Sequence, residues 1–217
     1  MGEGRLGQRL QKLPEQLTNV ILLGFFWTVT SLGIVTVGAA TTALNESMRA
    51  FLLEGDQKPL KVFFRAFREQ FKLSTLVWLI HLGILAVLAV DLLYYSVGKT
   101  AGDSFAMAVM CTLLTMLCFE LSVVFACMVQ FRPAGLRAAF SRAFDFAFRC
   151  FRESLEMLFI TAAVVAVGLF LFRGILPFGA GIVAWANWRI LPGAFRRYQT
   201  RTAATRKAEE RMEQKKP

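Results

Sequence analysis

Long apolar stretches separated by short basic segments organise most of the chain. The clearest stretches cover residues 73–97, 104–130 and 154–172, and each contains a single acidic residue. A helix that crosses a bilayer needs about 20 predominantly apolar residues. The pattern therefore predicts a membrane-spanning helix over each of these stretches, and a further one over residues 178–195.

The first apolar stretch has a different pattern. Residues 16–45 carry no formal charge over 30 positions, which is too long for one span and short for two. The segment 31–38 within it is rich in β-branched residues and contains two glycines, a composition typical of a turn. We expect one helix over 17–33 and a second over 36–53, with Thr36 as the N-cap of the second.

The second of these helices is polar for a membrane span. It carries Asn45, Glu46 and Arg49, and charged groups are costly where they face lipid. We therefore expect neighbouring helices to shield it. If the helices over 17–33 and 36–53 form a single crossing instead, the number of spans falls from six to five.

The predicted fold is an all-α, polytopic helical membrane protein. The expected organisation is a cytoplasmic polar lead over 1–16, a single transmembrane domain over 17–195 with spans at about 17–33, 36–53, 73–97, 104–130, 154–172 and 178–195, and a basic cytoplasmic tail over 196–217.

Composition agrees with this class of protein. Apolar types make up 56% of the 217 residues and charged types 18%, whereas a soluble domain has about 25% charged residues. These proportions argue against a soluble enzyme, a disordered chain and a secreted disulfide scaffold.

The net charge of +10 follows the membrane topology. We do not expect nucleic acid as a partner, because the basic residues lie in blocks between apolar runs. Lys and Arg number three, six, five and eight in residues 1–16, 45–72, 131–153 and 196–217, against one in 98–104. Segments rich in Lys and Arg are retained on the cytoplasmic side of a membrane. With six spans both termini are cytoplasmic, whereas with five the N-terminus lies outside.

Two similar segments each lead into an apolar stretch. Residues 64–71 are FRAFREQF and residues 148–155 are FRCFRESL, with five of eight positions identical at an offset of 84. On a helix, the phenylalanines fall on one face and the basic residues on the other. We expect two amphipathic interfacial helices, over 59–72 and 134–153, that contact lipid headgroups or a partner; the alternative is that both pack on protein. The basic residues expected to make these contacts are Lys61, Arg65, Arg68, Lys72, Arg142, Arg149 and Arg152.

Ionisable residues at membrane depth are candidate functional groups. At a rise of about 1.5 Å per residue, His81 and Glu120 lie roughly 12 and 15 Å from the same membrane face. A hairpin of 73–97 and 104–130 can bring them together. Such a pair can relay protons, bind a cation or only hold the hairpin together.

Other residues near the spans have structural interpretations. Asp91 is expected near Arg173, in a salt bridge that serves the fold. Trp185 and Trp188 are expected in the aromatic belt at the membrane interface.

Signatures of catalysis and metal binding are absent from the sequence. The chain has no P-loop, G-x-S-x-G or H-E-x-x-H motif, and it has a single His. Its four Cys show no C-x-x-C spacing, so we expect free thiols rather than disulfides or a zinc site. No enzyme activity, catalytic residue, cofactor or metal is expected.

Three features resemble the YesL family of bacterial integral membrane proteins. They are Trp27 in the first span, the segment 33–44 (GIVTVGAATTAL) and the aromatic segment 63–71. The resemblance is expected to cover about 17–198. It implies a bacterial inner-membrane protein of the kind encoded beside carbohydrate-uptake ABC transporters. Family members have no established activity, so the resemblance supplies no catalytic residues.

Three functions remain open at this point. The first is a non-enzymatic accessory in the lipid bilayer that binds a membrane protein, such as the permease of a carbohydrate-uptake ABC transporter, or forms a homo-oligomer. The alternative is a small secondary transporter or channel that uses His81, Glu120 and a cavity lined by the break at 33–42. A weaker alternative is a lipid-binding or membrane-shaping protein that acts through its amphipathic helices.

Overall fold

The described part of the computed structural model is helical. It covers residues 3–56, 58–97, 100–170 and 176–213, and no strand occurs within these ranges. The elements are α1 (Glu3–Thr30), a 3-10 turn η1 (Ile34–Thr36), α2 (Val37–Arg49), a π-helical turn η2 (Ala50–Glu54), α3 (Pro59–Val97), α4 (Ala101–Phe131), α5 (Leu136–Arg149), α6 (Phe151–Phe170) and α7 (Leu176–Glu213).

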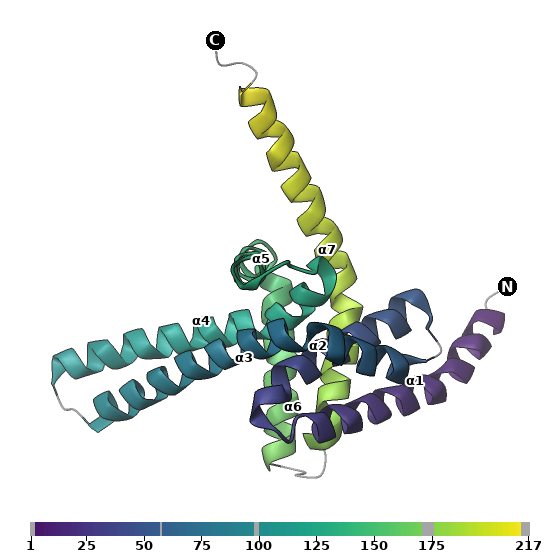
Figure 1. The fold of residues 1–217 in the computed structure, drawn as a ribbon, viewed down its shortest axis with the longest axis horizontal. Helices are drawn as coiled ribbons and strands as arrows, with labels where there is room; N and C mark the ends of the chain where they lie inside the picture. The colour runs from purple at the N-terminus through teal and green to yellow at the C-terminus, as the bar shows by residue number, and fades with distance from the viewer. Residues whose placement is uncertain (1–2, 57, 98–99, 171–175, 214–217) are drawn as a thin grey trace.

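Two helical hairpins meet around α2 (Figure 1). Helices α3 and α4 lie antiparallel, and their distal halves project together away from the other helices. Helix α6 packs against the first half of α7, which also packs on α1. The second half of α7 extends alone towards the C-terminus. The short helix α2 contacts α1, α3, α4 and α7, so it lies at the centre of the assembly.

Three helices are long and apolar enough to cross a membrane. They are α3, α4 over Gly102–Phe131, and α6. The apolar part of α1, Gln16–Thr30, is shorter. Helix α2 has 13 residues, or about 20 Å at 1.5 Å per residue, against a hydrocarbon core of about 30 Å. A membrane location is therefore plausible, with three spans supported by length and composition.

The predicted break after the first helix is present. Helix α1 ends at Thr30, and η1 follows over Ile34–Thr36. Thr36 holds the N-cap position of α2 but makes no capping bond with its side chain, so that part of the prediction is wrong. Its Oγ1 lies instead 2.6 Å from the carbonyl oxygens of both Thr30 and Gly33. The hydroxyl thus closes the turn rather than starting the helix.

The polar helix α2 is shielded, as its sequence predicts. Ten of its residues are buried. Glu46 Oε1 accepts hydrogen bonds from Arg49 at 3.1 Å and from Arg132 at 2.9 Å. Arg132 has a φ of 41° at the C-terminal end of α4, a left-handed conformation that closes a helix. This ion pair fixes the end of α4 against α2.

The two similar segments have different structures. Helix α3 is continuous over Pro59–Val97, so residues 59–72 do not form a separate interfacial helix as expected. No Gly or Pro lies between residues 60 and 82 to interrupt this helix. The second segment does form a separate helix, α5, which follows Pro133 and Gly135 and bends into α6 at Cys150. The repeat is therefore one of sequence and not of backbone.

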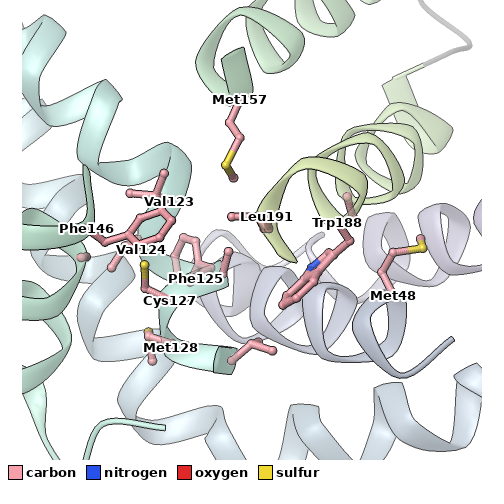
Figure 2. Packing of buried hydrophobic residues seen from close by; sticks show 14 of the residues in the cluster. Met48, Val123, Val124, Phe125, Cys127, Met128, Phe146, Met157, Trp188 and Leu191 are labelled. Atoms are coloured by element: carbon pink, nitrogen blue, oxygen red, sulfur yellow. The ribbon is translucent and has the colours of Figure 1, made fainter. Parts of the chain in front are cut away.

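The hydrophobic core draws residues from every α-helix, and Figure 2 shows the part to which α2, α4, α5, α6 and α7 contribute. Phe146 of α5 and Trp188 of α7 are among its largest fully buried side chains. Residues 123–129 of α4 are all buried between them. In contrast, large apolar side chains stay exposed along the distal halves of α3 and α4, including Val87, Leu93 and Phe105. The core therefore fixes only the proximal part of the α3–α4 hairpin.

Candidate functional site

The structure brings His81 and Glu120 together. His81 Nε2 lies 2.6 Å from Glu120 Oε2, and His81 is 1% exposed. The other ring nitrogen, Nδ1, lies 2.8 Å from the carbonyl oxygen of Val77, one turn earlier in α3. The ring of Phe140 from α5 stacks on the imidazole at 5.1 Å. The pair thus joins α3 to α4 beneath an aromatic cover.

The hydrogen bonds of this pair require one shared proton. A carbonyl oxygen only accepts, so Nδ1 of His81 carries a hydrogen. A second hydrogen must lie between Nε2 and the Glu120 carboxylate for the 2.6 Å contact. The pair is then either imidazolium with carboxylate or neutral imidazole with carboxylic acid. Both forms have no net charge, which makes burial in an apolar hairpin tolerable.

Glu120 also borders open space. Its second carboxylate oxygen, Oε1, is buried and has no hydrogen-bond partner in the described structure. A cleft of about 510 Å³ lined by Glu120, Ser141, Asp145 and three phenylalanines of α5 lies on one side. A cleft of about 260 Å³ with aliphatic walls from α3 and α4 lies on the other. Phe144 lines both clefts and stands between them.

The basic residues of the two amphipathic segments have different surroundings. Lys61, Arg65, Arg68 and Lys72 are all exposed on α3, and none of them makes an ion pair with another described residue. We call these four residues the basic face.

The basic residues of the second segment make contacts within the chain. Arg142 donates to the carbonyl oxygen of Phe131 at 2.9 Å. Arg149 pairs with Asp145 at 2.6 Å, and Arg152 with Glu156 at 3.1 Å.

Asp145 joins α5 to the middle of α7. The hydroxyl of Tyr198 donates to Asp145 Oδ2 at 2.6 Å. Burial alone would raise the pKa of Asp145, but the bonds from Tyr198 and Arg149 lower it below its usual value. Burial and the neighbouring carboxylate raise the pKa of Tyr198 to about 12. This contact is anionic at neutral pH and fixes α5 on the core.

A second site lies at the centre of the molecule, and the segment 33–42, expected to line a cavity, contributes Thr41 to it. A partly open cavity of about 420 Å³ is lined by residues of α1, α2, α3, α4, α6 and α7. We call it the central cavity. Its polar lining residues are Thr41, Asn45, Ser122, Thr161 and Asn187. The available signal was the recurrence of single Ser, Thr and Asn residues within apolar stretches.

Tryptophan side chains fasten the break between α1 and α2 beside this cavity. Trp27 Nε1 donates to Thr41 Oγ1 at 3.1 Å, and Trp78 Nε1 donates to the carbonyl oxygen of Ile34 at 2.7 Å. Trp188 Nε1 donates to Asn45 Oδ1 at 2.9 Å. The prediction that Trp188 belongs to the interfacial belt is wrong, because it is 1% exposed.

Two other expectations have different outcomes. Trp185 is half-buried, with the guanidinium carbon of Arg189 4.1 Å from its ring centroid. The expected salt bridge from Asp91 involves Arg173, which lies outside the described residues. Within the described ranges, no group of three or more His, Cys, Asp or Glu is arranged to hold a metal ion.

One family model matches part of the chain. Residues 17–92 match the model of a family described as "Protein of unknown function, DUF624". The match includes Trp27 and the segments 33–44 and 63–71, and it is shorter than the expected range of 17–198. Searches of curated proteins and of solved structures returned no match. The matched segment covers α2 and the break before it, and it ends within α3.

Proposed function

We propose that this chain is a non-enzymatic integral membrane protein that acts by binding another membrane protein. The observation that carries this role is the surface of α3. Its basic face and its exposed distal half belong to one continuous helix of 39 residues. A partner with membrane helices and an acidic cytoplasmic surface complements both parts at once.

The exposed distal half of α3 is suited to close contact with another helix. Gly83, Ala86 and Ala89 are all exposed, and nothing lies within 4 Å of the position where a Cβ of Gly83 would be. Small residues let membrane helices approach closely. The larger apolar residues Val87, Val90 and Leu93 flank them.

We further propose that the partner is the permease of a carbohydrate-uptake system, in a bacterial inner membrane. This part of the proposal comes from the resemblance to the YesL family. The basic face belongs to the Lys- and Arg-rich segment 45–72, which we expect on the cytoplasmic side, where acidic surfaces of a transporter are accessible. A second copy of the chain is the competing occupant of the same surface.

Co-purification tests this function. The tagged protein, at native expression, is extracted in mild detergent and its companions are identified by mass spectrometry. We expect a stoichiometric permease that is lost when Arg65 and Arg68 are changed to Gln. The matched control changes Arg196 and Arg211 of α7 to Gln, which removes the same charge elsewhere. A homo-oligomer without a partner contradicts the proposal.

A second candidate function is proton-coupled transport. The shared proton of the His81–Glu120 pair and the unpartnered Glu120 Oε1 beside open clefts favour it. The Glu120→Gln variant keeps a hydrogen bond to His81 but cannot release a proton. We expect it to abolish proton-coupled uptake in proteoliposomes while assembly is preserved, if transport is the function. Equal uptake by Glu120→Gln and the unmodified protein excludes it.

The lipid-binding alternative has one observation in its favour. Phe144, Phe148 and Phe151 are 47%, 50% and 54% exposed around the end of α5. Aromatic residues beside a basic segment are typical of a helix that lies at the membrane interface. Retention on anionic liposomes that weakens with salt is the expected result of that role.

A further inference from the structure

Among the described residues, the central cavity is lined without any ionisable side chain. Its walls consist of apolar and neutral polar residues from six helices. An ion placed there without a counter-charge costs several kcal/mol. A ligand for this cavity is therefore neutral.

The hydroxyl groups of the cavity have their hydrogens engaged. Thr41 Oγ1 donates to the carbonyl oxygen of Val37 at 2.7 Å and accepts from Trp27. Ser122 Oγ donates to Phe119 O at 2.7 Å. Because a hydroxyl has one hydrogen and two lone pairs, the remaining capacity of these groups is to accept.

Thr161 has the same arrangement. Its Oγ1 donates to the carbonyl oxygen of Met157 at 2.9 Å. The engaged hydrogens leave the hydroxyls on α4 and α6 as acceptors.

Asn187 supplies an acceptor with no partner. The residue is 5% exposed, and its Oδ1 makes no hydrogen bond to any described group. A buried acceptor without a hydrogen bond destabilises the protein, because its desolvation is not offset. A ligand that donates a hydrogen bond to Oδ1 recovers this energy.

The size of the cavity limits the ligand further. At about 30 Å³ per non-hydrogen atom, the volume that a water molecule takes in the liquid, 420 Å³ holds roughly 14 such atoms. A monosaccharide of similar size carries several hydroxyls, and the mostly apolar walls cannot form hydrogen bonds to all of them. A hydrocarbon chain with one hydroxyl fits both the apolar lining and the unpartnered acceptor, Asn187 Oδ1.

We propose that the central cavity binds a neutral lipid alcohol, with its hydrocarbon among the apolar walls and its hydroxyl donating to Asn187 Oδ1. Trp27 and Trp78 line the same cavity, so the bound chain contacts both indoles. This site is distinct from the basic face and does not depend on the proposed protein partner.

Quenching of tryptophan fluorescence tests the proposal. The purified protein in lipid nanodiscs is titrated with ω-bromododecanol, bromododecane and ω-bromododecanoate at equal mole fractions in the membrane. Bromine quenches indoles that it contacts. We expect the alcohol to quench at about tenfold lower mole fraction than the alkane, since one hydrogen bond to a buried acceptor contributes about a factor of ten. Equal potency of alcohol and alkane, or preference for the carboxylate, overturns the proposal.

A pair of matched variants locates the hydroxyl. Asn187→Leu removes the free acceptor, and we expect it to abolish the preference for the alcohol while quenching by the alkane persists. Asn19→Leu makes the same change on α1, outside the cavity lining, and should keep the preference. An unchanged preference in Asn187→Leu overturns the assignment. If Asn187→Leu does not fold, the comparison of the three ligands on the unmodified protein still decides.

Discussion

Replacing Gly38 with Ala tests how closely α2 and α3 pack. A Cβ at position 38 would lie 2.4 Å from the carbonyl oxygen of Ser74 and 2.5 Å from Trp78 Cβ. Ordinary van der Waals contact begins at 3.4 Å, so the two helices must separate by about 1 Å, and a gap of that size forfeits up to half of the local dispersion energy. The Ser74 oxygen belongs to the backbone and cannot rotate away.

The expected magnitude follows from two opposing effects. Overpacking costs about 1–3 kcal/mol, and the rigid neighbour places Gly38→Ala at the upper end. Ala is favoured over Gly within a helix by up to about 1 kcal/mol. We expect the free energy of unfolding to fall by about 2 kcal/mol, the difference between about 3 and about 1.

Reversible unfolding by a denaturing detergent, followed by tryptophan fluorescence, measures this loss. Gly83→Ala is the matched control on α3, because an added Cβ there meets nothing within 4 Å. It should be neutral or stabilising by up to about 1 kcal/mol. Gly38→Ala at or above the stability of the unmodified protein would refute the close approach of α2 and α3.

The remaining predictions concern three other contacts. Changing either His81 or Glu120 to Leu leaves the other polar side chain buried without its partner and should lower the free energy of unfolding by about 3–5 kcal/mol. The double variant should recover most of this loss. Additive losses in a double-mutant cycle would contradict a direct interaction between the two residues. Tyr198, with a pKa raised from 10.0 to about 12, favours the folded state at pH below 10, and this contribution is lost as pH rises towards 12. The tyrosinate absorbance that disappears in Tyr198→Phe should therefore titrate near pH 12, and a midpoint near 10 would contradict the buried contact with Asp145. Gly83→Leu should block co-purification of the partner without lowering stability, and retention of the partner would exclude α3 as the contact surface.

Hydrophobic patterning predicted most of the helices and the hairpin. The long charge-poor stretches became α3, α4 and α6, and counting residues from one membrane face was sufficient to place His81 and Glu120 at similar depth. These features depend on local composition and on helix geometry, which a single sequence records.

Features that depend on tertiary packing were not predictable in the same way. Gly38 falls within the helix expected over 36–53 and lies in α2, but its position in the sequence does not reveal that its missing side chain admits α3. Trp188 has the composition of an interfacial residue and lies in the core because Asn45 accepts its N–H. The central cavity combines residues of six helices, and no spacing along the chain reveals that combination.

The sequence repeat shows the same limit at the level of the backbone. The segments 64–71 and 148–155 share five letters, but the first lies within α3 and the second spans the bend between α5 and α6. The difference lies at the third position of the segments, where Ala66 continues α3 whereas Cys150 ends α5 with φ −115° and ψ 45°.

Photo-crosslinking in native membranes tests the central claim most directly. A photoreactive amino acid replaces Leu93 or Val97 on α3, whose side chains are 70% and 79% exposed. The buried control places it at Met157, which is 1% exposed. We predict that the exposed positions crosslink to one membrane protein, identified as a transporter permease, and that Met157 does not. Crosslinks only to lipid or to a second copy of the chain would contradict a function that depends on binding another membrane protein.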